Sequence, residues 1–254
     1  MEIRVLGCHG AEMPGYRTTC FMINETTLVD AGSITSVLEL GEQKAIKDIL
    51  VTHSHLDHIK DIPLFADNIV GTLESHVNVI SSKEVISVLK NHLFNNIIWP
   101  DFSRIPTPEK PVINFIEIEP GIPFKVNGLT VLAVEVNHPV PTLGYILSDD
   151  DGSMAILGDT GPTTEIWKTI GETKNMKGVF IETSFPNSMG DLAELSGHLT
   201  PDMLEKEIAK LNGSKIPVYV YHMKPNFLGT LESEISDLKN ESISMLSLDQ
   251  SLQF

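Results

Sequence analysis

Basic side chains are scarce in this sequence of 254 residues, which has 18 lysines and arginines against 34 aspartates and glutamates and a formal net charge of −16 at pH 7. Proteins that bind a nucleic acid backbone need positive charge gathered on one face. The composition therefore argues against a binding surface for DNA or RNA, and we expect no nucleic acid partner.

Cysteine and long apolar runs are also scarce. The two cysteines, Cys8 and Cys20, are too few for a disulfide framework. No apolar run approaches the ~20 residues that span a bilayer, and the N-terminus lacks a basic cluster followed by a long apolar segment. We therefore expect a cytoplasmic protein with no membrane partner. The sequence leaves open whether the chain forms a homodimer.

Apolar residues make up 41% of the chain and occur in short runs. Runs rich in valine, isoleucine and leucine, bounded by glycine, proline, asparagine or aspartate, predict strands at residues 2–6, 19–23, 27–30, 48–52, 77–80, 112–118, 129–136, 143–147, 154–157, 179–182, 218–221 and 243–248. Helical spacing predicts helices at residues 34–42, 83–94, 163–170, 201–211 and 231–239. This mixture indicates a layered α/β architecture. Because no repeat or change of composition divides the chain, we expect one domain over residues 1–254.

The predicted helix at residues 201–211 has the clearest boundaries. Thr200 can cap its first turn, and Pro201 suits the first helical position. The pair Asn212 and Gly213 is typical of a helix end.

Histidine is the most informative residue type, and it occurs nine times. The apolar run at 48–52 is followed by His53-Ser54-His55-Leu56-Asp57-His58. His53 and His55 point to the same side if the chain is still extended, and a turn near Leu56 would carry Asp57 and His58 to an adjacent position. This arrangement suits two neighbouring metal ions. Imidazole and carboxylate ligands together favour zinc, iron or manganese over calcium.

Three further candidate ligands, His138, Asp159 and His222, each stand where an apolar strand gives way to a loop. Because α/β folds place their chemistry at strand ends, we expect these side chains to converge with the first group at one rim of a sheet. A lone histidine at a strand end is commonly an ordinary polar residue, but the whole pattern favours a metal site.

The pattern His-x-His-x-Asp-His, followed by a later His, Asp and His, resembles the metallo-β-lactamase superfamily. The resemblance covers nearly the whole chain, from the turn LVDAG at 28–32 to His222. It implies an α/β fold of the αββα sandwich type, with two mixed sheets flanked by helices. It also implies two divalent metal ions, zinc first and manganese or iron as alternatives. The implied ligands are His53, His55 and His138 for one ion and Asp57, His58 and His222 for the other, with Asp159 bridging both.

A ligand set with an aspartate bridge and no cysteine resembles the phosphodiesterase branch of that superfamily. The segments NHPVPTLGY at 137–145 and LGDTGPT at 157–163 are similar to both the tRNA 3′-end endonucleases (tRNase Z) and the class II cyclic-nucleotide phosphodiesterases. The class II pattern is also similar to NNIIWPDF at 95–102, to IETSF at 181–185 with SGHLTP at 196–201, and to YHMKP at 221–225. Together with the acidic composition, the resemblance implies hydrolysis of 3′,5′-cyclic nucleotides, cyclic AMP or cyclic GMP, to 5′-nucleotides.

The implied reaction needs a nucleophile, which a hydroxide bridging the two metal ions would supply, and a proton for the leaving oxygen. His198 is not a ligand and stands before the helix that begins at Pro201, a position that suits a surface residue and a proton donor equally. The resemblance favours the proton donor. Glu182 is predicted to orient His198 or a metal-bound water, and Asp57 counts as catalytic as well as a ligand. Two divalent ions would leave the pocket positive despite the net charge of −16, so a small anionic phosphodiester is the expected partner.

Other functions remain open. The alternatives are a tRNase Z-like or general phosphodiesterase, then a thioester or lactone hydrolase on the same metals, then a metal-binding scaffold without catalysis.

Three residues near these motifs have two interpretations each. Asp61 stands where the superfamily commonly has glycine. It either perturbs groups around the ligands or caps the next helix, and we favour the cap. Lys224 either contacts phosphate or is a solvated lysine. His9 lies in an N-terminal loop that the fold can bring near the site, although we favour a structural role.

Overall fold

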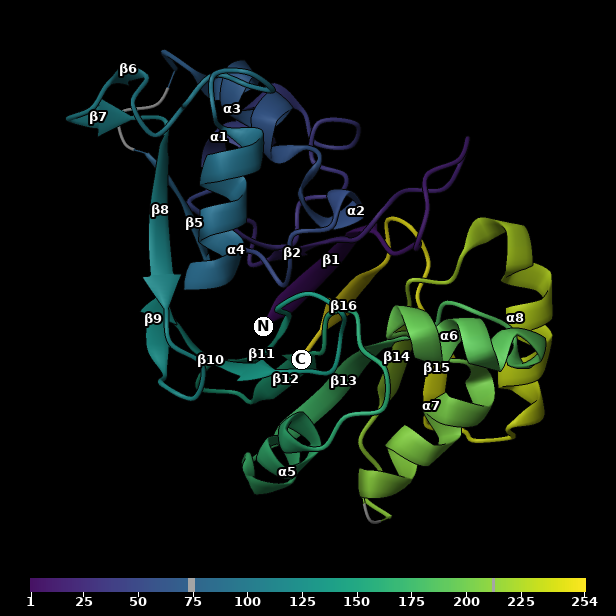
Figure 1. The fold of residues 1–254 in the computed structure, drawn as a ribbon. Coiled ribbons are helices and arrows are strands. Elements are labelled where there is room, and N and C mark those ends of the chain that lie inside the picture. The colour runs from purple at the N-terminus through teal and green to yellow at the C-terminus, as the bar shows by residue number, and fades with distance from the viewer. Residues whose placement is uncertain (73–75, 212) are drawn as a thin grey trace.

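Two seven-stranded mixed sheets form the centre of the protein (Figure 1). The computed structural model describes residues 1–72, 76–211 and 213–254. The first sheet has the order β16 (Ser251–Gln253), β1 (Glu2–Gly7), β2 (Cys20–Ile23), β3 (Thr27–Val29), β4 (Asp48–Leu50), β5 (Val77–Ser82) and β8 (Ile113–Ile118). The second has the order β15 (Ile243–Met245), β14 (Val218–Tyr221), β13 (Met176–Glu182), β12 (Ser153–Ile156), β11 (Leu143–Ser148), β10 (Leu129–Glu135) and β9 (Phe124–Val126).

Three apolar layers hold the sheets and helices together. The middle layer lies between the two sheets, where the ring of Phe21 meets Phe180 and Tyr221 at centroid distances of 5.2 Å. The outer layers join each sheet to its own helices (Figure 1). These helices are α3 (Ile62–Ile69) and α4 (Lys83–Val88) on the first sheet, and α5 (Glu165–Glu172), α7 (Pro201–Ile208) and α8 (Leu228–Asp237) on the second. α1 (Leu40–Ala45) packs against α3, where Asn68 Nδ2 donates to Gln43 Oε1 at 3.1 Å. The expected sandwich of two sheets flanked by helices is therefore confirmed.

Every predicted strand is present, with small shifts at the ends. The sequence pattern missed four short strands: β6 (Pro106–Thr107), β7 (Lys110–Pro111), β9 and β16. Three of these have exposed or half-buried residues throughout, so they lack the apolar run that marks a buried strand.

The predicted helix at residues 34–42 is wrong in its position, because α1 begins only at Leu40. Ile34 and Leu38 are both buried, and a turn in which Leu38 N–H bonds to the Ile34 carbonyl oxygen brings them together. The spacing of four residues therefore reflects burial in a turn. The helices α2 (Leu56–Ile59), α3 and α6 (Gly190–Ser196) lie outside every predicted helical range, although a helix was expected after Asp61.

The other predicted helices are confirmed. The segment at 83–94 forms α4 followed by a π-helical turn at Leu89–Leu93, and α7 continues as a 3₁₀ turn at Ala209–Leu211. Thr200 caps α7 by accepting the N–H of Met203 at 3.4 Å, with Pro201 in the first turn. Asn212, expected to help end this helix, lies outside the described residues. Across the described ranges, no helix has the length and apolar character that crossing a bilayer requires.

Candidate metal centre

The predicted ligands lie at one edge of the sandwich because their strands end there. His53 and His55 follow β4, whereas His138, Asp159 and His222 follow β10, β12 and β14 of the second sheet. β12 and β14 run parallel to β13 on its two sides, and β10 runs the same way because both β10 and β12 are antiparallel to β11. The strands of both sheets therefore deliver polar side chains to a shared rim.

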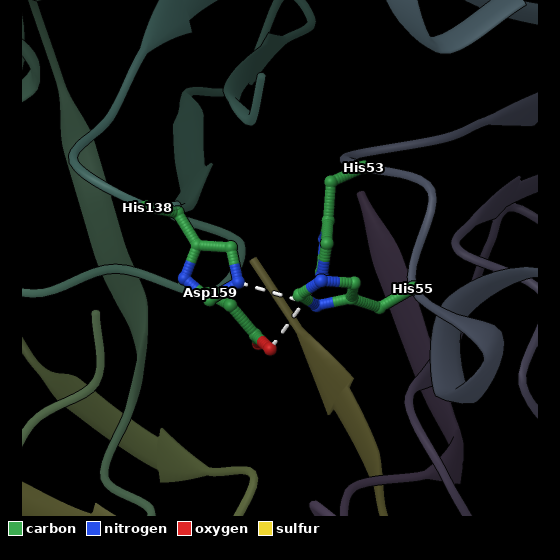
Figure 2. Close-up of side chains that lie close together, drawn as sticks. All are labelled: His53, His55, His138 and Asp159. Atoms are coloured by element: carbon green, nitrogen blue, oxygen red, sulfur yellow. Dashed lines mark hydrogen bonds and ion pairs between the residues drawn. The ribbon is translucent and has the colours of Figure 1, made fainter. Parts of the chain in front are cut away.

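The first group consists of His53, His55, His138 and Asp159, whose possible ligand atoms all lie within 4.8 Å of one another. Figure 2 shows these side chains directed toward a common centre. His138 Nε2 lies 3.3 Å from His55 Nδ1, and His53 Nε2 lies 3.7 Å from Asp159 Oδ2.

The second group consists of Asp57, His58, Asp159 and His222 and meets the same 4.8 Å limit. One turn of α2, which starts directly after His55, turns Asp57 and His58 toward the second sheet. His222 Nε2 lies 3.2 Å from Asp57 Oδ2 and 3.3 Å from His58 Nε2. Asp159 belongs to both groups, so its carboxylate lies between them.

Both groups fit divalent cations. Among the described residues, the buried atoms His53 Nε2 and Asp159 Oδ1 have no hydrogen-bond partner. Buried polar atoms without a partner are costly, and a cation at this centre would satisfy them. Two pairs of imidazole nitrogens lie 3.3 Å apart, one between His58 and His222 and one between His55 and His138. In each pair, both nitrogens would direct a lone pair at such an ion.

Burial and neighbouring charges set the ionisation of the ligands. Burial lowers the pKa values of His53, His55 and His138, which keeps these imidazoles neutral as metal ligands must be. Burial would raise the pKa of Asp57, but the hydrogen bond with His222 and the charge of His58 hold it below its usual value. Burial would also lower the pKa of His58, yet the charges of Asp159 and Asp30 raise it.

Asp30, at the end of β3, supports one histidine of each group. Its carboxylate accepts hydrogen bonds from the Thr52 N–H at 2.8 Å and from His58 Nδ1 at 2.7 Å. Thr52 Oγ1 donates to Asp30 at 2.9 Å and lies 3.0 Å from His53 Nδ1, so it can accept that ring's proton. Such partners fix which ring nitrogen faces the metal. The sequence did not indicate this role, although Asp30 stands at a strand end as Asp159 does.

Two further ligand histidines, His138 and His222, are supported from the second sheet. His138 Nδ1 donates to the Gly197 carbonyl oxygen at 2.8 Å, and His222 Nδ1 lies 2.9 Å from Ser184 Oγ. The backbone of His222 has a φ of 65°, a left-handed conformation that the bond from its N–H to the Cys8 carbonyl oxygen at 2.6 Å helps to hold.

Glu182, His198 and Ser184 form a buried cluster beside the second group. Glu182 Oε1 accepts from His198 Nδ1 at 2.6 Å, and Glu182 Oε2 accepts from Ser184 Oγ at 2.9 Å. Because Ser184 also lies against His222, one carboxylate connects the predicted proton donor with a predicted ligand. Burial would lower the pKa of His198, but the charge of Glu182 and its hydrogen bond raise it above the usual value.

Two glycines allow this close packing. A Cβ at Gly10 would lie 2.5 Å from the His222 carbonyl oxygen and 2.7 Å from its Nδ1. Gly197, which precedes His198, has a φ of 66°, and a Cβ there would lie 2.5 Å from Pro139 Cδ. Both positions require glycine because any side chain would meet atoms next to a predicted ligand.

The structure corrects one expectation about Asp61. This residue occupies the position before α3, but its side chain makes no capping hydrogen bond to that helix. Its Oδ2 instead accepts from the Thr35 N–H at 2.8 Å and from Thr35 Oγ1 at 3.0 Å. Its backbone is helical, with a φ of −89° and a ψ of −11°, whereas a capping residue is usually extended. Asp61 therefore anchors the 31–35 loop.

His9 lies close to the site. It is buried, its ring packs edge-on against Tyr16 at 4.9 Å, and its backbone pairs with Met223, next to His222. Its role is to hold the N-terminal loop against the strand end that carries His222, which agrees with the structural role that we favoured.

Comparisons with known proteins agree with this geometry. A family model described as "Beta-lactamase superfamily domain" matches residues 30–223. A "Probable 3′,5′-cyclic-nucleotide phosphodiesterase" of Yersinia pestis is 28% identical over 280 aligned positions, gaps included, in an alignment that covers 89% of this chain and 79% of that protein. A "3′,5′-cyclic-nucleotide phosphodiesterase" of Aliivibrio fischeri is 30% identical over 246 aligned positions, gaps included, in an alignment that covers 81% of this chain and 74% of that protein. The crystal structure of unliganded yeast PDE1 has the same fold, with a TM-score of 0.83 at 22% identity and coverage of 100% of this chain and 99% of that one.

Proposed function

Because the chain belongs to the β-lactamase superfamily, we propose that it is a metal-dependent phosphodiesterase that hydrolyses 3′,5′-cyclic nucleotides to 5′-nucleotides. The observation that carries this proposal is the pair of ligand groups that share Asp159 and adjoin the His198–Glu182 pair. The names of the two bacterial relatives support the choice of substrate.

The residues that would hold the metals are His53, His55 and His138 for one ion and Asp57, His58 and His222 for the other, with Asp159 facing both. We propose zinc, because a set of imidazoles and carboxylates suits it, with manganese and iron as alternatives. When bound, the ions would activate a water molecule and neutralise charge on the phosphoryl oxygens.

His198 would supply the proton that the leaving 3′ oxygen needs when the bond from phosphorus breaks. Glu182 accepts from Nδ1, so Nε2 is the atom of the ring that remains to donate a proton to substrate. The same carboxylate stabilises the protonated imidazole. Burial would lower the pKa of His198, but the charge of Glu182 outweighs burial and raises it. Glu182 therefore acts as the positioning residue and His198 as the acid.

The charge of the protein favours a small substrate over a polynucleotide. A chain with an excess of 16 acidic residues offers a tRNA little of the basic surface that phosphate contacts need. A cyclic nucleotide carries one phosphate, which two bound divalent ions would attract.

We further propose that residues 1–254 form one domain that works in the cytoplasm. The apolar layer between the two sheets contains residues from both halves of the chain, which supports a single folding unit. In the described structure, Cys8 and Cys20 are buried and free of disulfides, which is typical of a reducing compartment.

The test is a panel of substrates given to protein of measured metal content: cyclic AMP, cyclic GMP, bis-p-nitrophenyl phosphate, a precursor tRNA and a thioester. We expect turnover of a cyclic nucleotide, lost in His198→Ala while both metal ions stay bound. Hydrolysis of bis-p-nitrophenyl phosphate but of neither cyclic nucleotide would overturn the proposed substrate class. Full turnover by His198→Ala would overturn the role of His198. No turnover with two metals bound would favour the scaffold.

A further inference from the structure

A lysine lies beside the proposed proton donor. Lys224 follows His222 by two residues and is partly buried. Its Nζ donates to the Gly10 carbonyl oxygen at 3.1 Å and lies 5.2 Å from the centre of the Phe185 ring. That ring centre is 5.8 Å from the His198 ring, so the ammonium is linked to His198 through one aromatic side chain.

The charge of Lys224 has no acidic partner among the residues that the structure describes. Two other partly buried lysines do contact carboxylates, Lys60 with Glu12 at 3.3 Å and Lys210 with Glu207 at 2.6 Å. In a chain with 34 acidic residues, an ammonium held near a reaction centre without a carboxylate is free to meet an anion. The bond to Gly10 uses one of its three protons and leaves two donors.

The proposed reaction creates negative charge at this place. A cyclic phosphodiester carries one negative charge, and the phosphomonoester product carries up to two. A fixed cation that contacts the phosphoryl group beside His198 would therefore stabilise the later stages of bond breaking more than the bound substrate.

We propose that Lys224 binds the phosphoryl group of the substrate and stabilises the charge that develops as the bond to the leaving oxygen breaks. The Gly10 carbonyl and the Phe185 ring hold the ammonium in place for this role. The inference rests on the proposed phosphodiesterase function.

Three substitutions separate charge from structure. Lys224→Met removes both the charge and the hydrogen bond to Gly10, Lys224→Gln keeps a donor without the charge, and Lys224→Arg keeps the charge. The matched control is Lys90→Met, because Lys90 lies 5.4 Å from the Phe115 ring centre, away from the site, and pairs with Glu117 at 3.6 Å.

The experiment uses the metal-loaded full chain and measures kcat and KM on bis-p-nitrophenyl phosphate and cyclic AMP. Calorimetry measures the affinity for 5′-AMP, and elemental analysis measures the metal content. We expect Lys224→Met and Lys224→Gln to lower kcat/KM about 10- to 100-fold and to weaken 5′-AMP binding about tenfold, with both metal ions retained. Lys224→Arg should recover most of both, and Lys90→Met should match the unaltered protein.

Recovery by Lys224→Gln would overturn the inference, because it would show that only the contact with Gly10 matters. Loss of metal in Lys224→Gln would also overturn it, by assigning the lysine to the structure of the metal centre. If the cyclic nucleotides are not hydrolysed but the generic diester is, the proposed substrate fails while the role of Lys224 is still decided on the generic diester.

Discussion

At the scale of single residues, the predicted ligands depend on hydrogen-bond partners that are not themselves predicted ligands. Asp30 is the clearest of these, because it supports His58 directly and His53 through Thr52. Its own backbone is left-handed, with a φ of 60°, and its N–H bonds to the Leu50 carbonyl oxygen at 2.8 Å. The Asp30 carboxylate can accept from the Thr52 N–H, the Thr52 hydroxyl and His58 Nδ1 at once, because it has two acceptor oxygens.

We predict that Asp30→Asn weakens the binding of both metal ions about 10- to 100-fold. The amide keeps the shape but offers one acceptor oxygen in place of two, so its NH₂ group must face a donor from Thr52 or His58. Competition with a chromogenic chelator measures the affinity.

The control for this variant is Asp61→Asn, which changes another buried carboxylate. Thr35 bonds to Asp61 Oδ2 and Lys60 Nζ to Oδ1 at 3.3 Å, so an amide can retain the Thr35 contact and loses only the one with Lys60. Unchanged metal affinity in Asp30→Asn, or an equal loss in both variants, would contradict the role assigned to Asp30.

At the scale of elements, the site depends on how tightly the N-terminal loop packs against the end of β14. The Cys8 carbonyl accepts the His222 N–H at 2.6 Å, and the Gly10 N–H bonds to the Met223 carbonyl oxygen at 3.3 Å. Lys224 closes the same contact through the Gly10 carbonyl. The loop therefore fixes the backbone position of a predicted ligand.

We predict that Gly10→Ala destabilises the protein by about 1–3 kcal/mol and weakens metal binding, because the new Cβ would overlap the backbone oxygen of His222. Chemical denaturation measures the free energy of unfolding, and elemental analysis measures the metal content. Gly171→Ala is the matched control, since Gly171 lies in α5 with open space at the Cβ position. That variant should keep its metals and be no less stable than the unaltered protein, because alanine favours a helix more than glycine does. An equal loss of stability and metal in both variants would argue against the packing explanation.

At the scale of the whole molecule, the metal centre joins the two sheets. His53, His55, Asp57 and His58 come from the first sheet and its connections, whereas His138, Asp159 and His222 come from the second. Bound cations would therefore act as a cross-link between the layers as well as a catalyst. Without them, buried polar atoms of both sheets lose their partners.

We predict that removal of the metals by a chelator lowers the midpoint of thermal unfolding. Free metal at about 1,000 times its dissociation constant contributes about 4 kcal/mol per site to the stability of the folded protein. Differential scanning calorimetry with and without chelator measures the change, and added zinc should reverse it. Equal midpoints in the two conditions would show that the centre is not coupled to folding.

The sequence alone determined the strands that have a clear apolar run, and it indicated the predicted ligands. Each depends on local information: an apolar run of strand length, followed at its end by histidine or aspartate. His53, His138, Asp159 and His222 could be recognised in this way without knowing which strands are neighbours. The helix placed at residues 34–42 shows the limit of the same reasoning, because the burial of Ile34 and Leu38 produces helical spacing within a turn.

Only the tertiary structure decided which residues support the site. Ser184 meets His222 across 38 positions of sequence, and Lys224 meets Gly10 across 214. These contacts exist because the two sheets and the N-terminal loop pack in one particular way, and that packing depends on shape complementarity over the whole core. A pattern of local residue types carries no information about such distant pairs, so the ligands could be predicted from the sequence while their partners could not.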